Sequence, residues 1–148
     1  TDYEMLRSLV CSEMCIRDSL YIPLWGWAMK LLNPIAINRS KPKEAIVQTL
    51  DEGSKRLKSG LYVLLFPEGT RVAAGKVGNY ARSSFELAKR NNVKVLPICH
   101  NSGDCWPAHK FLKNSGTIKL SIGQPFNVVD SKQSAEKIRT WTEEKLNS

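Results

Sequence analysis

Residues 61–66 form an unbroken apolar run that stops abruptly at Pro67. A short apolar run bounded by turn residues is typical of a strand buried on both faces. Proline has no N–H to give to a sheet, so Pro67 ends the strand, and Gly69 lets the backbone turn tightly. Ligands of open α/β sheets bind beyond the carboxyl ends of strands. A site is therefore expected at the turn that contains Pro67, Glu68, Gly69, Thr70 and Arg71.

Strand and helix patterns alternate along most of the remaining chain. Residues 35–37 are apolar and predict a short strand, followed by a helix that begins near Ser40 and Pro42 and stops at Gly60. The pattern then predicts a helix over residues 81–90, strands over 93–99 and 117–123, and a last helix capped by Asp130 or Ser131. This order predicts a single α/β domain with a mostly parallel sheet flanked by helices.

The spacing of apolar residues also predicts which side chains face the core. Three sets lie at helical spacing and one set alternates as in a half-buried strand. The helical sets are Ile46, Leu50 and Leu57; Ala81, Phe85 and Ala88; and Ile138, Trp141 and Lys145; the strand set is Ile118, Leu120 and Ile122.

Residues 1–19 differ from the rest of the chain. They have no clean helical stripe, and residues 11–19 resemble translated sequencing-adapter read-through. We therefore divide the chain into residues 1–19, a segment foreign to the natural protein or a poorly ordered terminus, and residues 20–148, the functional domain.

The net charge is +8, from 22 lysines and arginines against 14 acidic residues. An anionic membrane surface, a phosphorylated small molecule and nucleic acid are all compatible with this charge. The basic residues are scattered and no aromatic-rich RNA motif is present, which disfavours nucleic acid. An apolar segment containing Trp25 and Trp27 is too short to span a bilayer. It suits either a membrane interface or a core helix interrupted by Pro23 and Gly26.

The four cysteines, Cys11, Cys15, Cys99 and Cys105, do not have the spacing of a zinc site. So few cysteines in a chain of this length predict reduced thiols rather than a disulfide framework.

Two arginines follow predicted strands, Arg39 after residues 35–37 and Arg71 after residues 61–66. In a parallel sheet both lie at the same edge, where two guanidinium groups would bind a phosphate; the alternative is that each is a solvated surface charge. Glu68 would align Arg71, accept a hydrogen bond from a substrate hydroxyl, or balance the arginines. Lys76 and Arg82 are expected to be exposed.

Other catalytic patterns are absent or incomplete. The run from Gly69 to Lys76 does not fit the phosphate loop G-x-x-x-x-G-K-[ST], which excludes nucleotide hydrolysis on that basis. His100 and Asp104 have the types of a base and its orienting carboxylate, but an exposed or structural histidine is favoured. No G-x-S-x-G or H-E-x-x-H motif is present.

Residues 66–71, Phe-Pro-Glu-Gly-Thr-Arg, resemble the third motif of the glycerolipid acyltransferase family, in particular its members that act on lysophosphatidate. Residues 35–39 resemble the second motif, with Asn38 in place of the usual acid before Arg39. Residues 95–98, with Pro97, resemble the fourth. The similarity extends from about Leu20 to the end of the chain. The third motif is specific, and the other two agree with it in order.

The first motif of that family, N-H-x-x-x-x-D, is absent from this sequence. His100 and Asp104 do not replace it, because their spacing is one residue short and they lie downstream of the other motifs. The resemblance therefore implies an acyltransferase fragment that lacks the catalytic histidine and aspartate.

The resemblance implies transfer of a fatty acyl group from acyl-CoA or acyl-carrier protein to lysophosphatidate, without a metal or other cofactor. Arg39, Phe66, Pro67, Glu68, Gly69, Thr70 and Arg71 would bind the acceptor. Glycerol 3-phosphate stays open as the acceptor. The chain would work on an anionic membrane surface, at the cytoplasmic face of a bacterial inner membrane, without nucleic acid. The alternative is a non-catalytic basic module that binds anionic lipid or phosphate.

Overall fold

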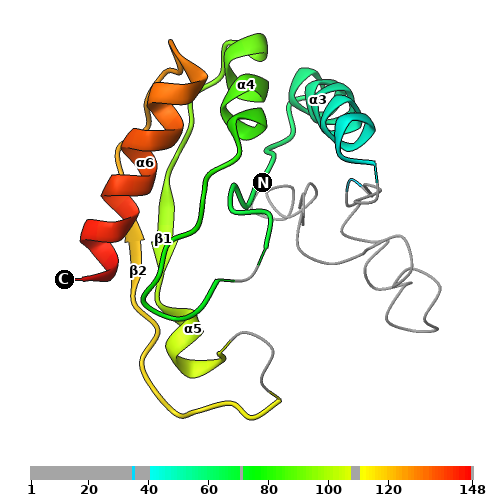
Figure 1. The fold of residues 1–148 in the computed structure, drawn as a ribbon. Helices are drawn as coiled ribbons and strands as arrows, with labels where there is room; N and C mark the ends of the chain where they lie inside the picture. The colour runs from blue at the N-terminus through cyan, green and yellow to red at the C-terminus, as the bar shows by residue number, and fades with distance from the viewer. Residues whose placement is uncertain (1–34, 36–40, 71, 108–110, 148) are drawn as a thin grey trace. The chain divides into compact units, whose positions relative to one another are not determined.

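The computed structural model describes residues 35, 41–70, 72–107 and 111–147. The chain divides into two compact units, Thr1–Phe66 and Pro67–Ser148. The first unit contains α3 (Pro42–Lys58); the second contains α4 (Arg82–Asn91), β1 (Ile98–His100), α5 (Ser102–Cys105), β2 (Leu120–Ile122) and α6 (Ser131–Leu146), as Figure 1 shows. No helix in the described ranges has both the length and the apolar character to cross a membrane.

Helix α3 starts and stops where the sequence predicts. Pro42 stands in its first turn, where a missing N–H costs nothing. At its end the Gly60 N–H donates to the Leu57 carbonyl and the Leu61 N–H to the Arg56 carbonyl, with Gly60 at φ +81°. This is a Schellman motif, which needs the left-handed conformation that glycine adopts without strain. Ser40, the predicted cap, lies outside the described residues.

The predicted core stripe of α3 is correct for Leu50 and wrong for Ile46, which is 47% exposed. The buried residues of this helix are Ala45, Leu50 and Gly53. Helical spacing identifies which residues share a face of the helix. It does not show how much of that face other parts of the protein cover.

The apolar run of residues 61–66 is not a strand buried on both faces, as its sequence predicts. Only Leu64 is in a strand bridge, and Tyr62 and Leu64 are 69% and 40% exposed while residues 61, 63 and 65 are half-buried. This is the alternation of a segment covered on one face. An entirely apolar run conceals which face that is. Of the preceding strand predicted over 35–37, the structure describes only Ile35, which is buried.

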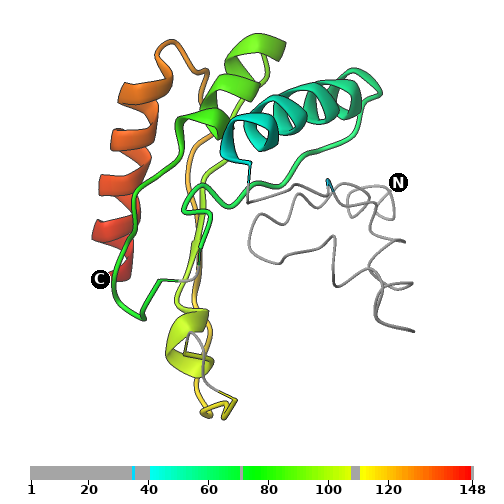
Figure 2. The same cartoon turned by 45° about the vertical axis from the view of Figure 1, so that its right-hand side comes forward.

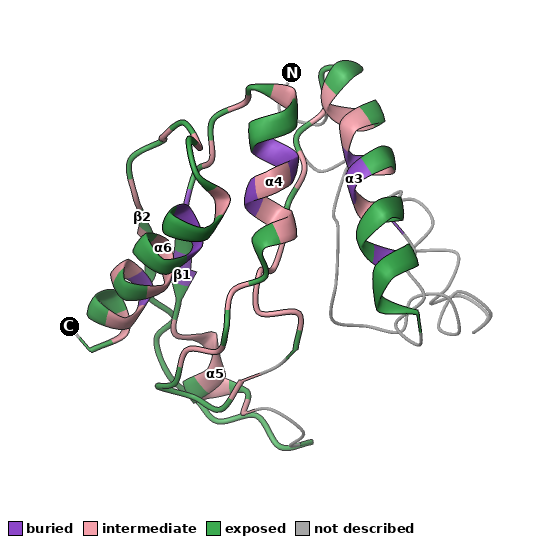
Figure 3. Ribbon diagram, turned by 45° about the horizontal axis from the view of Figure 1, so that its top comes forward, coloured by how far each residue is buried: buried purple, intermediate pink, exposed green. Residues whose placement is uncertain are grey.

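In the second unit α4 packs against α6, and α6 against β1. Both views of the ribbon show α6 running alongside the β1–β2 pair (Figures 1 and 2). The buried residues of α4, α6 and β1, coloured purple in Figure 3, form the core of this unit. They are Phe85, Leu87, Ala88, Cys99, Ser134, Ala135 and Thr142.

Both helices of this core have capped ends. The Asp130 carboxylate accepts the Gln133 N–H at 2.7 Å, which confirms the predicted cap of α6. Helix α4 ends at Asn92, whose φ of +50° is left-handed. The Ser131 hydroxyl donates to Glu86 at 2.7 Å and connects α6 to α4. Ala81, predicted to face the core, is instead the exposed N-cap residue of α4, because the helix begins one residue later than its apolar spacing suggests.

Strands β1 and β2 are antiparallel, with Ile98 opposite Ile122 and His100 opposite Leu120. A parallel sheet is not seen in the described ranges, so that part of the predicted fold is not confirmed. In its described residues the connection between β1 and β2 holds one helix, the four-residue α5, whereas a parallel crossover usually needs a longer helix.

Pro97 interrupts the strand predicted over residues 93–99. Val95 pairs with Phe126 in an isolated bridge, and regular pairing starts again only at Ile98. Two residues separate Val95 from Ile98, but three separate Ile122 from Phe126, so the second segment bulges. Proline cannot donate to the ladder, which explains the break.

The apolar alternation of residues 118–122 lies on the opposite face of the ribbon from the one expected. Ile118, Leu120 and Ile122 are all more than half exposed. The other face turns toward α6: a Cβ at Gly123 would lie 3.1 Å from the Trp141 ring and 2.7 Å from Pro97. Because side chains alternate along a strand, this close approach at Gly123 forces Ile122 outward.

Leu87→Ala should test the packing of the second unit. Leu87 is only 2% exposed, and truncating a buried leucine leaves a cavity, so we expect the free energy of unfolding to fall by about 2–5 kcal/mol. Urea denaturation followed by circular dichroism measures this. Leu112→Ala is the matched control, because Leu112 is 77% exposed; an equal loss in both variants would contradict the assigned core.

Candidate functional site

The predicted site turn begins the second unit. Pro67 and Glu68 form the turn, and Gly69 has a φ of +64°, a left-handed conformation that explains why glycine stands there. Thr70 is exposed. The ligand site predicted at this turn stays a prediction.

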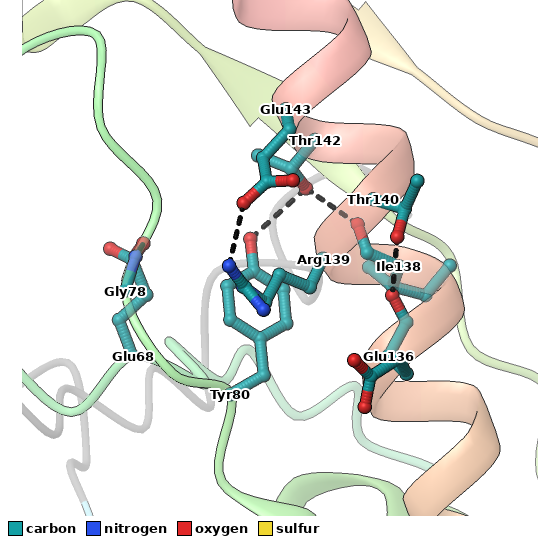
Figure 4. A network of polar contacts seen from close by, with 9 residues as sticks. All are labelled: Glu68, Gly78, Tyr80, Glu136, Ile138, Arg139, Thr140, Thr142 and Glu143. Atoms are coloured by element: carbon teal, nitrogen blue, oxygen red, sulfur yellow. Dashed lines mark hydrogen bonds and ion pairs between the residues drawn. The ribbon is translucent and has the colours of Figure 1, made fainter.

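Two hydrogen bonds close the loop that follows this turn. The Ala81 N–H donates to the Pro67 carbonyl at 2.7 Å, next to the start of α4. Inside it, the Gly78 N–H donates to Glu68 Oε1 at 2.8 Å (Figure 4). A Cβ at Gly78 would lie 3.0 Å from the Val72 side chain, so the loop closes tightly on itself. We call residues 67–81 the motif loop.

The contact with Gly78 gives Glu68 a role that the sequence did not reveal. The predicted roles were to align Arg71, to accept a substrate hydroxyl or to balance nearby arginines. In the structure one carboxylate oxygen of the half-buried Glu68 is already engaged by the Gly78 N–H. Hydrogen bonds from N–H groups to a carboxylate are stronger than neutral ones, so Glu68 holds the motif loop in shape.

Tyr80 connects the motif loop to α6. Its hydroxyl donates to Thr142 Oγ1 at 3.0 Å, and the Thr142 hydroxyl donates to the Ile138 carbonyl (Figure 4). Burial raises the pKa of the Tyr80 phenol, while the Thr142 hydrogen bond lowers it and the Glu68 charge raises it. Beside Tyr80, Arg139 and Glu143 of α6 form an ion pair at 2.9 Å.

Burial, and then the charge of Glu68, raise the pKa of the Cys99 thiol. Cys99 is buried and both Cys99 and Cys105 are free thiols, as expected; Cys11 and Cys15 lie outside the described residues. Burial and a raised pKa both disfavour the thiolate form that a nucleophilic cysteine needs.

His100 and Asp104 do not form a catalytic pair. His100 is exposed at the end of β1, and its Nδ1 lies 2.8 Å from the Ser102 hydroxyl. Among the described residues no hydrogen bond or ion pair joins its ring to Asp104, whose backbone N–H instead donates to the carbonyl of Asn101, the residue before α5. The sequence preference for an exposed histidine is confirmed.

The structure leaves part of the predicted acceptor site undescribed. Arg39 and Arg71 lie outside the described residues, and Phe66 belongs to the first unit. The expected meeting of the two arginines therefore stays a prediction. Lys76 and Arg82 are exposed, as expected. Shallow hollows on the described surface lie along α3 and along α6, and neither is lined by the motif loop.

Sequence reasoning missed Gly78, Tyr80 and Thr142. No local sequence pattern couples a carboxylate to an N–H ten residues later, or a tyrosine to a threonine 62 residues away. The only available signal was the second glycine of the loop, because a residue without a Cβ permits such an approach.

Comparison with known proteins gives a consistent result. The sequence model of the family described as Acyltransferase matches residues 4–101. A 1-acyl-sn-glycerol-3-phosphate acyltransferase of Pseudomonas aeruginosa is 46% identical over 112 residues, which are 76% of this chain and 44% of that protein. A chloroplastic enzyme of the same name from Arabidopsis thaliana is 32% identical over 72% of this chain and 30% of its own length. The chain thus spans less than half the length of these two relatives.

A solved structure shares the fold. The 1-acyl-sn-glycerophosphate (LPA) acyltransferase PlsC from Thermotoga maritima matches with a TM-score of 0.74 and 22% identity. The match covers 95% of this chain and 55% of that one.

Glu68→Ala should loosen the motif loop. It removes the acceptor of the Gly78 N–H, and a hydrogen bond to a charged group is worth enough to speed amide exchange at Gly78 about tenfold. Hydrogen exchange followed by NMR measures this. Glu68→Gln keeps an acceptor oxygen and should show a smaller effect; unchanged exchange at Gly78 in Glu68→Ala would exclude the proposed closure.

Tyr80 should make stability depend on alkaline pH. Its pKa is higher in the folded than in the unfolded chain, so its contribution is complete below the ordinary phenol value of 10.0. That contribution is lost as the pH rises from there through the folded pKa, because only the unfolded chain releases the proton readily. Urea unfolding across this range should show a steeper decline for the native chain than for Tyr80→Phe; parallel declines would refute the assignment.

Proposed function

The chain belongs to the acyltransferase family, and on that premise we propose that it supplies the acceptor-binding part of an acyl transfer to lysophosphatidate. The product would be phosphatidate, an intermediate of phospholipid synthesis. The observation that carries this proposal is the closed motif loop, in which Thr70 is exposed, in a chain with 46% identity to a 1-acyl-sn-glycerol-3-phosphate acyltransferase.

The acceptor phosphate would be held by Arg71 and Arg39. A guanidinium group binds phosphate through two parallel N–H donors, which gives both charge and orientation. Phe66, Pro67, Gly69 and Thr70 would shape the site around the acceptor. Glu68 would act through the loop: its bond to the Gly78 N–H fixes the backbone that leads to Arg71. A carboxylate repels phosphate, so a structural role fits it better than direct contact.

The reaction needs a general base, and we propose none within this chain. The acceptor hydroxyl oxygen attacks the carbonyl carbon of an acyl thioester, from acyl-CoA or acyl-carrier protein; the new C–O bond forms, the C–S bond breaks and the thiolate leaves. A general base takes the hydroxyl proton. The sequence contains no N-H-x-x-x-x-D, so we assign no catalytic residue within it. We propose no metal or cofactor.

The working location would be a membrane surface, because the acceptor is a lipid. The net charge of +8 favours anionic headgroups. We place the protein at the cytoplasmic face of a bacterial inner membrane, without a nucleic-acid partner.

Arg71→Ala should weaken lysophosphatidate binding by this chain about tenfold or more, because a charge-assisted bidentate contact is lost. Isothermal titration with a short-chain lysophosphatidate measures this. Arg71→Lys keeps the charge without the fork and should lose an intermediate amount. Arg82→Ala is the control, because Arg82 is exposed at the start of α4.

Equal affinity in Arg71→Ala and the unaltered chain would exclude the phosphate-binding role. Acyl transfer is then assayed with the natural protein that carries residues 20–148. Binding of lysophosphatidate without any transfer would favour the non-catalytic lipid-binding alternative.

A further inference from the structure

Large apolar side chains gather on the connection between α5 and β2. Phe111 is 96% exposed, Leu112 is 77% exposed and Trp106 is 52% exposed. We call these three residues the apolar tip. Exposed large apolar side chains that cluster on a soluble surface usually mark an interaction site. Nothing in the acyl-transfer proposal above uses them.

The stem of this connection is held in place. The Asn114 N–H donates to the Cys105 carbonyl at 2.7 Å, which ties the chain just after the tip to the end of α5. The Lys119 N–H donates to the side-chain oxygen of Asn101 at 2.7 Å, which ties the end of the connection to the residue before α5. A Cβ at Gly116 would lie only 2.9 Å from the Cys105 sulfur, so the returning chain also packs against α5. Phe111 and Leu112 are therefore presented by an anchored loop.

A basic side chain lies against the apolar tip. The Lys113 ammonium lies 4.2 Å from the centroid of the Trp106 ring, and Lys119 is exposed. The sequence from residue 101 to 119 contains three lysines and a single acidic residue, Asp104. Aromatic and aliphatic groups next to lysines are the composition that the interface of an anionic bilayer favours.

The helix that precedes the apolar tip contacts the motif loop of the same unit. A Cβ at Gly103 of α5 would be 3.5 Å from the Ala74 Cα, so α5 rests against the motif loop. Figures 1 and 2 show α5 and its following loop at one end of the second unit, and the connection from β2 to α6 at the other.

We propose that the apolar tip is a membrane-docking surface, in which Phe111 and Leu112 enter the interfacial layer of an anionic bilayer while Lys113 stays among the headgroups. A folded partner would need a broad complementary patch of several hundred square ångströms on each side. Side chains projecting from an anchored basic loop suit a bilayer better. This docking would bring lipid to the acceptor site proposed above, but it does not depend on acyl transfer.

The test is binding of the full chain to vesicles of phosphatidylcholine and phosphatidylglycerol without lysophosphatidate, measured by co-sedimentation. The double variant Phe111→Ser and Leu112→Ser should bind at least about tenfold more weakly, because both side chains lose apolar burial. Val129→Ser is the matched control, since Val129 is 82% exposed on the β2–α6 connection and should bind unchanged. Phe111, Leu112 and Val129 are all exposed, so the unfolding midpoints of both variants should equal that of the unaltered chain.

Charge supplies a second readout. Lys113→Gln should reduce binding to the phosphatidylglycerol vesicles and leave binding to phosphatidylcholine alone unchanged. Unaltered affinity of the Phe111/Leu112 double variant, or an equal loss in Val129→Ser, would overturn the proposal. The double variant should still bind a soluble short-chain lysophosphatidate, whereas Arg71→Ala should still bind vesicles, so failure of one proposal is distinguishable from failure of the other.

Discussion

The hydrogen bond from the Gly78 N–H to the Glu68 carboxylate organises the second unit around its motif loop. It closes the segment between Glu68 and Gly78. The hydrogen bond from the Ala81 N–H to the Pro67 carbonyl joins the residues on either side of that segment. With its ends fixed, the loop contacts α5 at Ala74, and its Tyr80 hydroxyl donates a hydrogen bond to Thr142 on α6. The charge of Glu68 also reaches β1, where it adds to the burial that raises the pKa of the Cys99 thiol.

This arrangement explains why an acid precedes an arginine in a turn proposed to bind a phosphate. A carboxylate beside a phosphate is repulsive, and it would cost binding energy if it faced the ligand. Here one oxygen of Glu68 is used inside the protein, so the acid contributes shape to the loop. Anion binding would then fall to the arginines, as proposed above. The same reasoning separates two functions that the sequence motif places side by side: building the turn and holding the ligand.

The two proposals place lipid binding at neighbouring parts of one unit. The motif loop would receive the headgroup phosphate, and the apolar tip beyond α5 would contact the bilayer from which such a lipid comes. Because α5 contacts the motif loop, the two proposed lipid-binding regions belong to neighbouring segments. This arrangement suits a lysolipid, which keeps its acyl chain in the membrane while its headgroup reacts. The positive charge of Lys113 beside Trp106 would then serve the same purpose as the arginines, which is to attract anionic lipid.

The sequence by itself determined the local features. Helix α3 begins at Pro42 and stops before Gly60, Asp130 caps α6, and Gly69 makes the turn. Each of these features depends on backbone geometry within a few residues. Family membership also followed from residues 66–71 and their neighbours in order. Only the tertiary structure decided that β1 and β2 are antiparallel, that Leu120 and Ile122 face outward, and that Glu68 meets Gly78. Those outcomes depend on contacts between residues far apart in the chain, such as Gly123 against Trp141, and a local pattern carries no information about which distant surface will cover it.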